Sequence, residues 1–217
     1  MTLLLSAVII ISAWLLIIFR ITKSTKNKAS TFWLSLFLLS ISLSLAEPFF
    51  ESKLKDSYSN FLATFYLFVT GPSLLFYCKS KLKHEKFRKV DALHFLPLLL
   101  YLFSGYFRFS ENHFVELVVT ESFFIHVMMY CYLSFEVIDD FDMSMNSIKL
   151  KRNLKLIKSI PIITGYVYMI IFFVINFNLI INNKVSDQSI YLIQILYSIY
   201  ILFVIFLLPD FNDDVYN

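Results

Sequence analysis

Glu121 and His126 are ionisable residues inside the long apolar stretch 114–136, and their chemistry fits poorly with these surroundings. They lie about eight and thirteen residues from its beginning, or roughly 12 and 20 Å along a helix. An ionisable group at such depth is costly in an apolar medium unless it is hydrated or paired. The two residues therefore favour a ligand pocket or a proton-sensitive pair. They are separated by roughly 140° around a helix and need not touch each other.

Other polar side chains recur at helical spacing in the neighbouring apolar stretches. Tyr66 and Thr70, for example, are four residues apart and would share one face of a helix. The alternative is structural, because hydroxyls and amides join membrane helices by hydrogen bonds and tyrosines favour membrane interfaces. Glu47 and Glu116 also fit an interfacial position. The candidate ligand-binding residues are Glu47, Tyr66, Thr70, Glu116, Glu121, His126, Asn176, Tyr191 and Gln194.

The sequence offers no recognisable catalytic or metal-binding set. Its four histidines are scattered, no HExxH or CxxC motif occurs, and Cys78 and Cys131 are far apart in the chain. We therefore expect no catalytic residue, no metal and no cofactor, and the chain is not expected to be an enzyme. A retinal pigment needs a lysine in its last helix, and the last apolar stretch has none.

Composition indicates the medium in which these residues lie. Of the 217 residues, 58% are hydrophobic and 16% are charged, and the mean hydropathy is +0.69. Soluble domains are about 45–50% apolar and about 25% charged. The 25 Phe and 13 Tyr exceed what one soluble core of this size could bury. The excess favours contact with lipid or between helices.

The apolar stretches are apolar all round, which favours helices that cross a bilayer over a soluble bundle or a β-barrel. A span needs about 20 residues as a helix. We predict an all-α, polytopic membrane protein, a single domain over 1–217. The seven expected spans are 3–19, 31–50, 58–77, 92–107, 114–136, 159–181 and 188–208.

Basic residues predict the orientation of these spans. Fifteen of the 19 Lys and Arg fall in three connections, 20–28, 79–89 and 149–158, which alternation places on one side. Cytoplasmic loops carry this excess, so we predict an outside N-terminus and an inside C-terminus. Anionic lipid is the natural neighbour of such charge. A nucleic-acid patch is disfavoured because no DNA-binding motif accompanies it.

Gly71 and Pro72 interrupt the third apolar stretch. Proline removes a backbone hydrogen bond and glycine lowers stiffness, so this pair is a candidate hinge.

Two short motifs carry a family resemblance. "GPSLLFYCKSKL" ends the third stretch, and "DALHFLPLLLYLF", with Leu93, His94, Phe95 and Pro97, opens the fourth. This order resembles the N-terminal seven-helix membrane module of AraC-type helix-turn-helix regulators from Bacteroidetes-like bacteria. That family carries a cytoplasmic DNA-binding domain after the seventh helix, whereas this chain stops at "LLPDFNDDVYN". We therefore expect either a module cut from a longer protein or a stand-alone membrane protein, with no direct nucleic-acid binding.

The resulting expectation is a sensor or receptor-like module in the bacterial inner membrane. It would bind an unknown small or lipophilic ligand and signal to a cytoplasmic partner in transcription regulation, or act as a homo-oligomer. The alternative is a small transporter or a membrane-embedded enzyme. A transporter often shows inverted repeats, and no clear repeat is visible. An enzyme should show a complete set of acids, bases or nucleophiles, and only Glu121 and His126 come near one.

Overall fold

Long helices account for the chain wherever the structure describes it. The computed structural model describes residues 10–11, 14–15, 18, 28–51, 56–100, 113–143, 148–182 and 187–207. Within these ranges, the side chains of 44–65, 67, 113–120, 143, 148–153, 182 and 187–188 are left undescribed, as are several in the last helix. The described backbone contains no strand, so the all-α prediction is confirmed for this part of the chain.

The helices run longer than the apolar spans expected from the sequence. Their bounds are α2 Lys28–Glu51, α3 Asp56–Leu82, η1 Lys89–Phe95, α5 His113–Met143, α6 Ile148–Asn182 and α7 Asp187–Leu207. η1 is a 3-10 helix, and the helical backbone continues over 96–100. Helix formation continues into the charged ends because Lys, Glu and Leu are good helix formers and charged side chains can reach water there.

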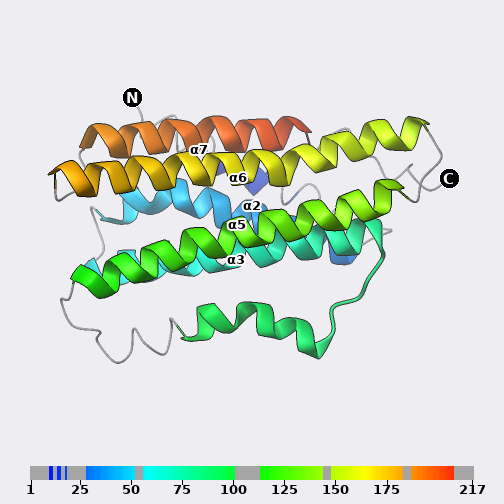
Figure 1. Cartoon of the computed structure of the whole chain (residues 1–217), viewed down its shortest axis with the longest axis horizontal. Coiled ribbons are helices and arrows are strands. Elements are labelled where there is room, and N and C mark those ends of the chain that lie inside the picture. Colours follow the sequence, from blue (N-terminus) through cyan, green and yellow to red (C-terminus); the bar gives the residue numbers. More distant parts are fainter. Residues whose placement is uncertain are drawn as a thin grey trace.

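The long helices lie side by side along one axis, antiparallel except for α3 and α5, which run parallel (Figure 1). α3 packs between α2 and α5, α5 packs on α6, and α6 packs on α7. α7 also contacts α2, so the five long helices close into a ring. η1 lies against the outer side of α3 (Figure 1). We call one end of the bundle the basic end. It holds the ends of α3, α5 and α7 and the beginnings of α2, η1 and α6.

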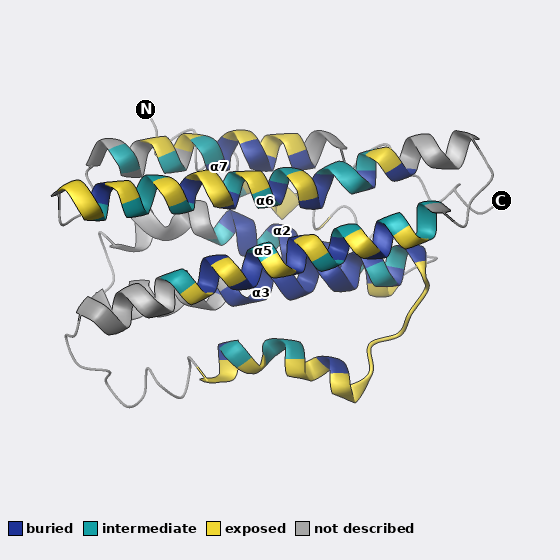
Figure 2. Cartoon of the chain, in the orientation of Figure 1, coloured by how far each residue is buried: buried dark blue, intermediate teal, exposed yellow. Residues whose placement is uncertain are grey.

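The core runs along the inside of this ring, where buried faces of all five helices meet (Figure 2). Burial of apolar surface stabilises it at about 25 cal/mol per Å². The largest fully buried side chains are Phe37, Leu38, Ile41, Leu74, Ile138, Ile160, Tyr168, Ile171, Tyr200 and Ile201.

The outer faces of the helices are also apolar. On α6, large hydrophobic side chains are exposed at intervals from Ile162 to Ile181, and Phe177 and Ile180 are 66% and 80% exposed. Within the described residues one helical stretch, Leu154–Ile181, is long and apolar enough to cross a membrane, and Lys28–Leu43 and Ile195–Val204 are shorter apolar stretches. Each of the other six expected spans includes residues whose backbone or side chains the structure does not describe.

Ion pairs join neighbouring helices at the basic end. Lys158 Nζ lies 2.5 Å from Asp139 Oδ1, and Lys83 Nζ lies 3.6 Å from Asp140 Oδ2. Lys158 also lies over the ring of Phe135, 4.4 Å from its centroid. These contacts tie α5 to both α3 and α6 where the helices leave their apolar region.

Candidate functional site

The structure describes the side chains of five of the nine candidate ligand-binding residues. Tyr66 and Thr70 lie on α3, Glu121 and His126 on α5, and Asn176 on α6. The predictions for Glu47, Glu116, Tyr191 and Gln194 fall on side chains outside the described residues.

Thr70 acts as a link between two helices. Its hydroxyl lies 3.0 Å from Ser40 Oγ on α2 and 2.9 Å from the Tyr66 carbonyl on its own helix. Ser40 donates its own proton to the Phe37 carbonyl, at 2.7 Å, so Ser40 can accept from Thr70. Both hydroxyls are buried. This arrangement matches the structural interpretation, in which hydroxyls hold helices together.

Asn176 and Glu121 lie away from this link. Asn176 is half-buried and donates its side-chain N–H to the Phe172 carbonyl of α6, at 3.0 Å. Glu121 is half-buried and makes no ion pair with a described residue. The structure therefore does not bring Asn176 and Glu121 into hydrogen-bond contact with Thr70.

His126 is the candidate with the most unusual environment. Its side chain is buried, and neither ring nitrogen has a hydrogen-bond partner of good geometry among the described residues, although the backbone of His94 lies close enough to interact with the ring. The ring packs edge-on against Phe68, with centroids 5.4 Å apart, and lies 4.7 Å from the ring of Tyr130. A buried polar group without a partner costs about 1–3 kcal/mol. A group that satisfies these nitrogens would remove that cost.

Tyr130, one turn along α5, connects His126 to η1. Its hydroxyl lies 2.6 Å from Nδ1 of His94, and the two rings are 5.5 Å apart. His94 also packs edge-on against Phe76 of α3. We call His94, His126 and Tyr130 the His–Tyr cluster. Sequence reasoning missed His94 and Tyr130 as site residues, although Tyr130 continues the four-residue spacing from His126.

Gly71 makes room for this cluster. A Cβ atom at position 71 would lie 2.9 Å from both Cβ and Cδ2 of Tyr130, closer than side chains tolerate. The glycine therefore lets the Tyr130 ring lie directly on the backbone of α3. Pro72 lies inside the helix, which continues to Leu82. The hinge at Gly71 and Pro72 stays a prediction, and contact with Tyr130 gives a second reason for the glycine.

An aromatic group next to η1 holds His94 in place. The rings of Trp33, Phe76, Phe87 and Phe95 lie close together, and Trp33 is 4.9 Å from Phe76 and 5.3 Å from Phe87. Such ring pairs add about 0.5–1.5 kcal/mol each beyond their buried area. The group joins α2, α3, the connection after α3 and η1.

Asp91 fixes the beginning of η1. Its carboxylate accepts the backbone N–H of Arg88 at 2.7 Å, and it lies 3.6 Å from the Arg88 guanidinium. The hydrogen bond from that N–H, followed by the Arg88 charge, holds the pKa of the Asp91 carboxyl below its usual 3.8, although burial opposes this shift. Asp91 therefore acts as a charged cap that orients the helix carrying His94.

A second polar pair crosses between α6 and α7. Thr164 Oγ1 and Tyr200 Oη are 2.6 Å apart and fully buried, and Thr164 also reaches the Ile160 carbonyl at 2.6 Å. Nearby, the buried Tyr168 packs its ring against Phe123, Phe124 and Tyr197, and its hydroxyl lies near the hydroxyls of Tyr197 and Thr70.

The His–Tyr cluster places hydrogen-bonding groups beside apolar rings. A neutral imidazole supplies one N–H donor and one acceptor nitrogen, and Phe68 and Tyr130 supply apolar ring surface. The described residues hold no group of three or more His, Cys, Asp or Glu that could bind a metal ion. No protein-family model, curated protein or solved structure matches the chain. The resemblance to the AraC-type membrane module therefore stays a prediction.

Proposed function

We propose that the chain is a multi-pass sensor module of the bacterial inner membrane. A small lipophilic ligand with one polar group would bind beside His126, and the signal would pass through Tyr130 and His94 to the basic end. There it would reach a cytoplasmic partner. The unpartnered, buried His126 is the observation that carries this proposal.

The surface of the bundle supports a membrane location. Exposed large hydrophobic side chains cover the outward faces of α5, α6 and α7, and monomeric soluble proteins rarely expose such extensive apolar surface. The described basic segments gather at one end, beginning with Lys28 and continuing with 79–89 and 155–158. This charge distribution favours the basic end as the cytoplasmic end.

Labelling of introduced cysteines tests this orientation. A cysteine at Ser186 should react with a membrane-impermeant maleimide in intact cells, whereas one at Lys83 should react only after permeabilisation. The native Cys78 and Cys131 are buried, so they should give little background. The reverse labelling pattern would overturn the orientation and the direction of signalling.

A ligand could act by changing which of two packings is favoured. Satisfying the nitrogens of His126 would recover about 1–3 kcal/mol, which shifts a two-state equilibrium about 5–150-fold. Tyr130 touches the ring of His126 and binds His94, so a group entering beside His126 would disturb the bond that holds η1. The state of His126 would thereby be coupled to the position of η1.

Three amphiphiles of equal chain length provide a direct test of ligand chemistry. Decanol can donate and accept a hydrogen bond, decanoate only accepts, and decylammonium only donates. We expect decanol to raise the melting temperature of the full chain in micelles most strongly. His126→Leu should abolish this difference among the three, and Thr164→Val, a buried polar change on the far helix pair, should preserve it. Equal shifts in wild type and His126→Leu would contradict the ligand site.

A further inference from the structure

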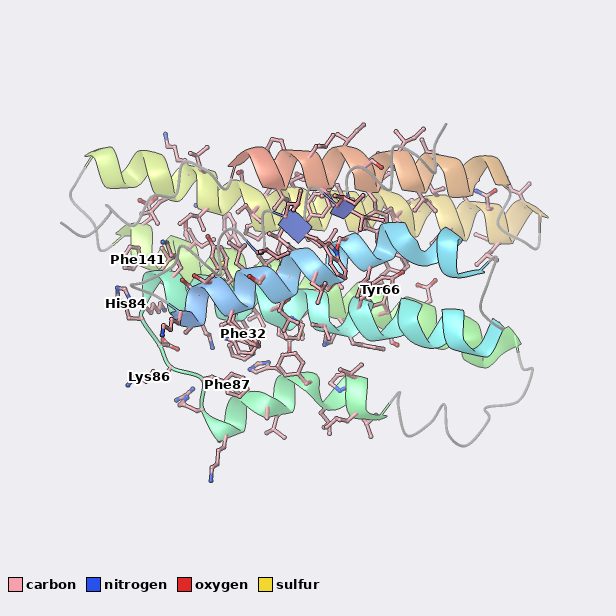
Figure 3. The ribbon with its side chains drawn as sticks, turned by 180° about the vertical axis from the view of Figure 1, so that it is seen from behind. Phe32, Tyr66, His84, Lys86, Phe87 and Phe141 are labelled. Carbon is pink, nitrogen blue, oxygen red and sulfur yellow. The ribbon has the colours of Figure 1, made fainter. Side chains whose placement is uncertain are left out.

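The connection between α3 and η1 is exposed and strongly basic. Every residue from 83 to 90 is exposed, and four of these eight are Lys83, Lys86, Arg88 and Lys89. His84 takes a left-handed backbone conformation, with φ of 50°, where α3 ends. Figure 3 shows His84, Lys86 and Phe87 along this connection, on the outside of the bundle.

The four basic side chains divide into two kinds. Lys83 is paired with Asp140 of α5, and Arg88 is paired with Asp91 of η1. Lys86 and Lys89 make no ion pair with a described residue. These two lysines therefore offer positive charge that the described part of the molecule does not neutralise.

An apolar stripe begins beside these lysines. Val90, Leu93 and Leu96 are 68%, 63% and 44% exposed, and they are spaced three residues apart. Side chains at i and i+3 eclipse in a 3-10 helix, so Val90 and Leu93 extend from one line on η1 toward Leu96 at its end. Another side of η1 carries Asp91, which is buried, and His94, which bonds to Tyr130 of α5. The exposed stripe is thus the outward face of a docked helix.

We propose that the outward face of η1, with Lys86 and Lys89, binds an anionic phospholipid of the cytoplasmic leaflet. The two lysines contact the phosphate of the headgroup, and the Val90–Leu93–Leu96 stripe lies against its acyl chains. A basic segment next to an exposed apolar stripe is the complement of such a lipid. The proposal rests on the membrane location in the proposed function and is independent of the ligand at His126.

Lipid retention on the full chain tests this site. The protein in detergent micelles is mixed with equal amounts of phosphatidylglycerol and phosphatidylcholine that have the same acyl chains, and native mass spectrometry counts the retained lipids. We expect phosphatidylglycerol to be preferred. Each lysine near an anionic headgroup contributes about fivefold, so the double variant K86Q/K89Q should weaken apparent binding about thirtyfold.

Two further variants and one competitor separate the alternatives. Lys155→Gln changes an exposed lysine on α6 near the basic end and should leave the preference intact. V90S/L93S should lower retention of both lipids while keeping the preference for phosphatidylglycerol.

Soluble glycerol phosphate should compete poorly, because it lacks acyl chains, and strong competition by it would overturn the lipid assignment. Equal retention of phosphatidylglycerol by wild type and K86Q/K89Q would also overturn the proposal.

Carbonate extraction of cell membranes separates failure of this site from failure of the membrane location. A chain that stays in the washed membrane but shows no preference for phosphatidylglycerol overturns the lipid site alone. A chain released by carbonate overturns the membrane location as well.

Discussion

Tyr200 and Tyr130 each join two helices through a hydrogen bond of 2.6 Å, yet their surroundings differ. Tyr200 binds a fully buried threonine between two long helices, and that threonine has a second bond to its own helix. Tyr130 binds a half-buried histidine on a seven-residue 3-10 helix, and its ring touches the unpartnered His126. We therefore expect the bond between Tyr200 and Thr164 to hold α6 and α7 together, and the bond between Tyr130 and His94 to open more easily.

This difference depends on what else would have to move. Breaking the Tyr200 bond opens the contact between α6 and α7, which belongs to the closed ring of five helices. Breaking the Tyr130 bond loosens one attachment of η1, which lies outside that ring against α3. Local opening costs less free energy than global unfolding where few buried contacts are lost. We therefore expect the Tyr130 bond to open at a lower free-energy cost than the Tyr200 bond.

Substitution of Gly71 should have the largest effect. Gly71→Ala places a Cβ 2.9 Å from Tyr130 and should lower the free energy of unfolding by about 1–3 kcal/mol, with a larger loss for Gly71→Leu. Gly165→Ala is the matched control, because its Cβ would meet Cys131 Cβ at an ordinary 3.7 Å. That control should be neutral or slightly stabilising. Denaturation in mixed micelles measures both, and equal effects would show that Tyr130 does not require the glycine.

Tyr200→Phe should weaken the whole bundle. Loss of the bond to Thr164 should lower the free energy of unfolding by about 0.6–1.5 kcal/mol. Thr164 keeps its bond to the Ile160 carbonyl, so the loss should stay at this modest level. Hydrogen exchange in residues 89–96 should not change. Faster exchange confined to 89–96 would remove the contrast between the two tyrosines.

Tyr130→Phe removes the hydrogen bond to His94, which has the same length as the bond between Tyr200 and Thr164, but we expect a local effect and not a global one. Exchange of the backbone amides in residues 89–96 should accelerate about 3–10-fold, because His94 loses its partner. The free energy of global unfolding should change by less than about 0.5 kcal/mol, since η1 opens without the ring. A decrease in the free energy of global unfolding as large as that of Tyr200→Phe would show that Tyr130 also stabilises the whole bundle.

The cap on η1 should respond to acid. The pKa of Asp91 is lowered in the folded protein, so its stabilisation is present above the unfolded value of about 3.8 and is lost as pH falls through the lower folded value. Protection of the amides near residues 88–91, corrected for intrinsic exchange, should therefore fall as pH drops below about 4. Asp91→Ala should cost about 1 kcal/mol of local stability at neutral pH and remove this acid dependence.

The helical architecture could be predicted from the sequence, because long apolar runs with only three Gly leave few alternatives to helices. The ends could not be predicted as well. The expected spans ended at residues 77 and 136, whereas α3 and α5 continue to Leu82 and Met143. Hydropathy marks where a chain is apolar, and these helices extend into charged turns where Lys83 and Lys158 form ion pairs with α5.

The candidate site was only partly predictable for a related reason. His126 is buried, as its position in an apolar stretch indicates, and the spacing of Tyr66 and Thr70 did place both on one buried face. The bond between Tyr130 and His94 joins residues 36 positions apart, and it depends on a 3-10 helix held by Asp91. Local spacing carries no signal for such a long-range pair. The close contact of Gly71 with Tyr130 is hidden from the sequence in the same way.

Hydrogen exchange of residues 89–96 in His126→Leu tests the coupling between His126 and η1 most directly. Leucine is similar in size to histidine and has no polar atom to satisfy, so the closed packing should gain the free energy that the unpartnered nitrogens cost. Exchange in 89–96 should slow by about 5–150-fold in the full chain, while Thr164→Val should leave it unchanged. Unchanged or faster exchange in His126→Leu, with the bundle still folded, would contradict the claim that His126 controls the position of η1.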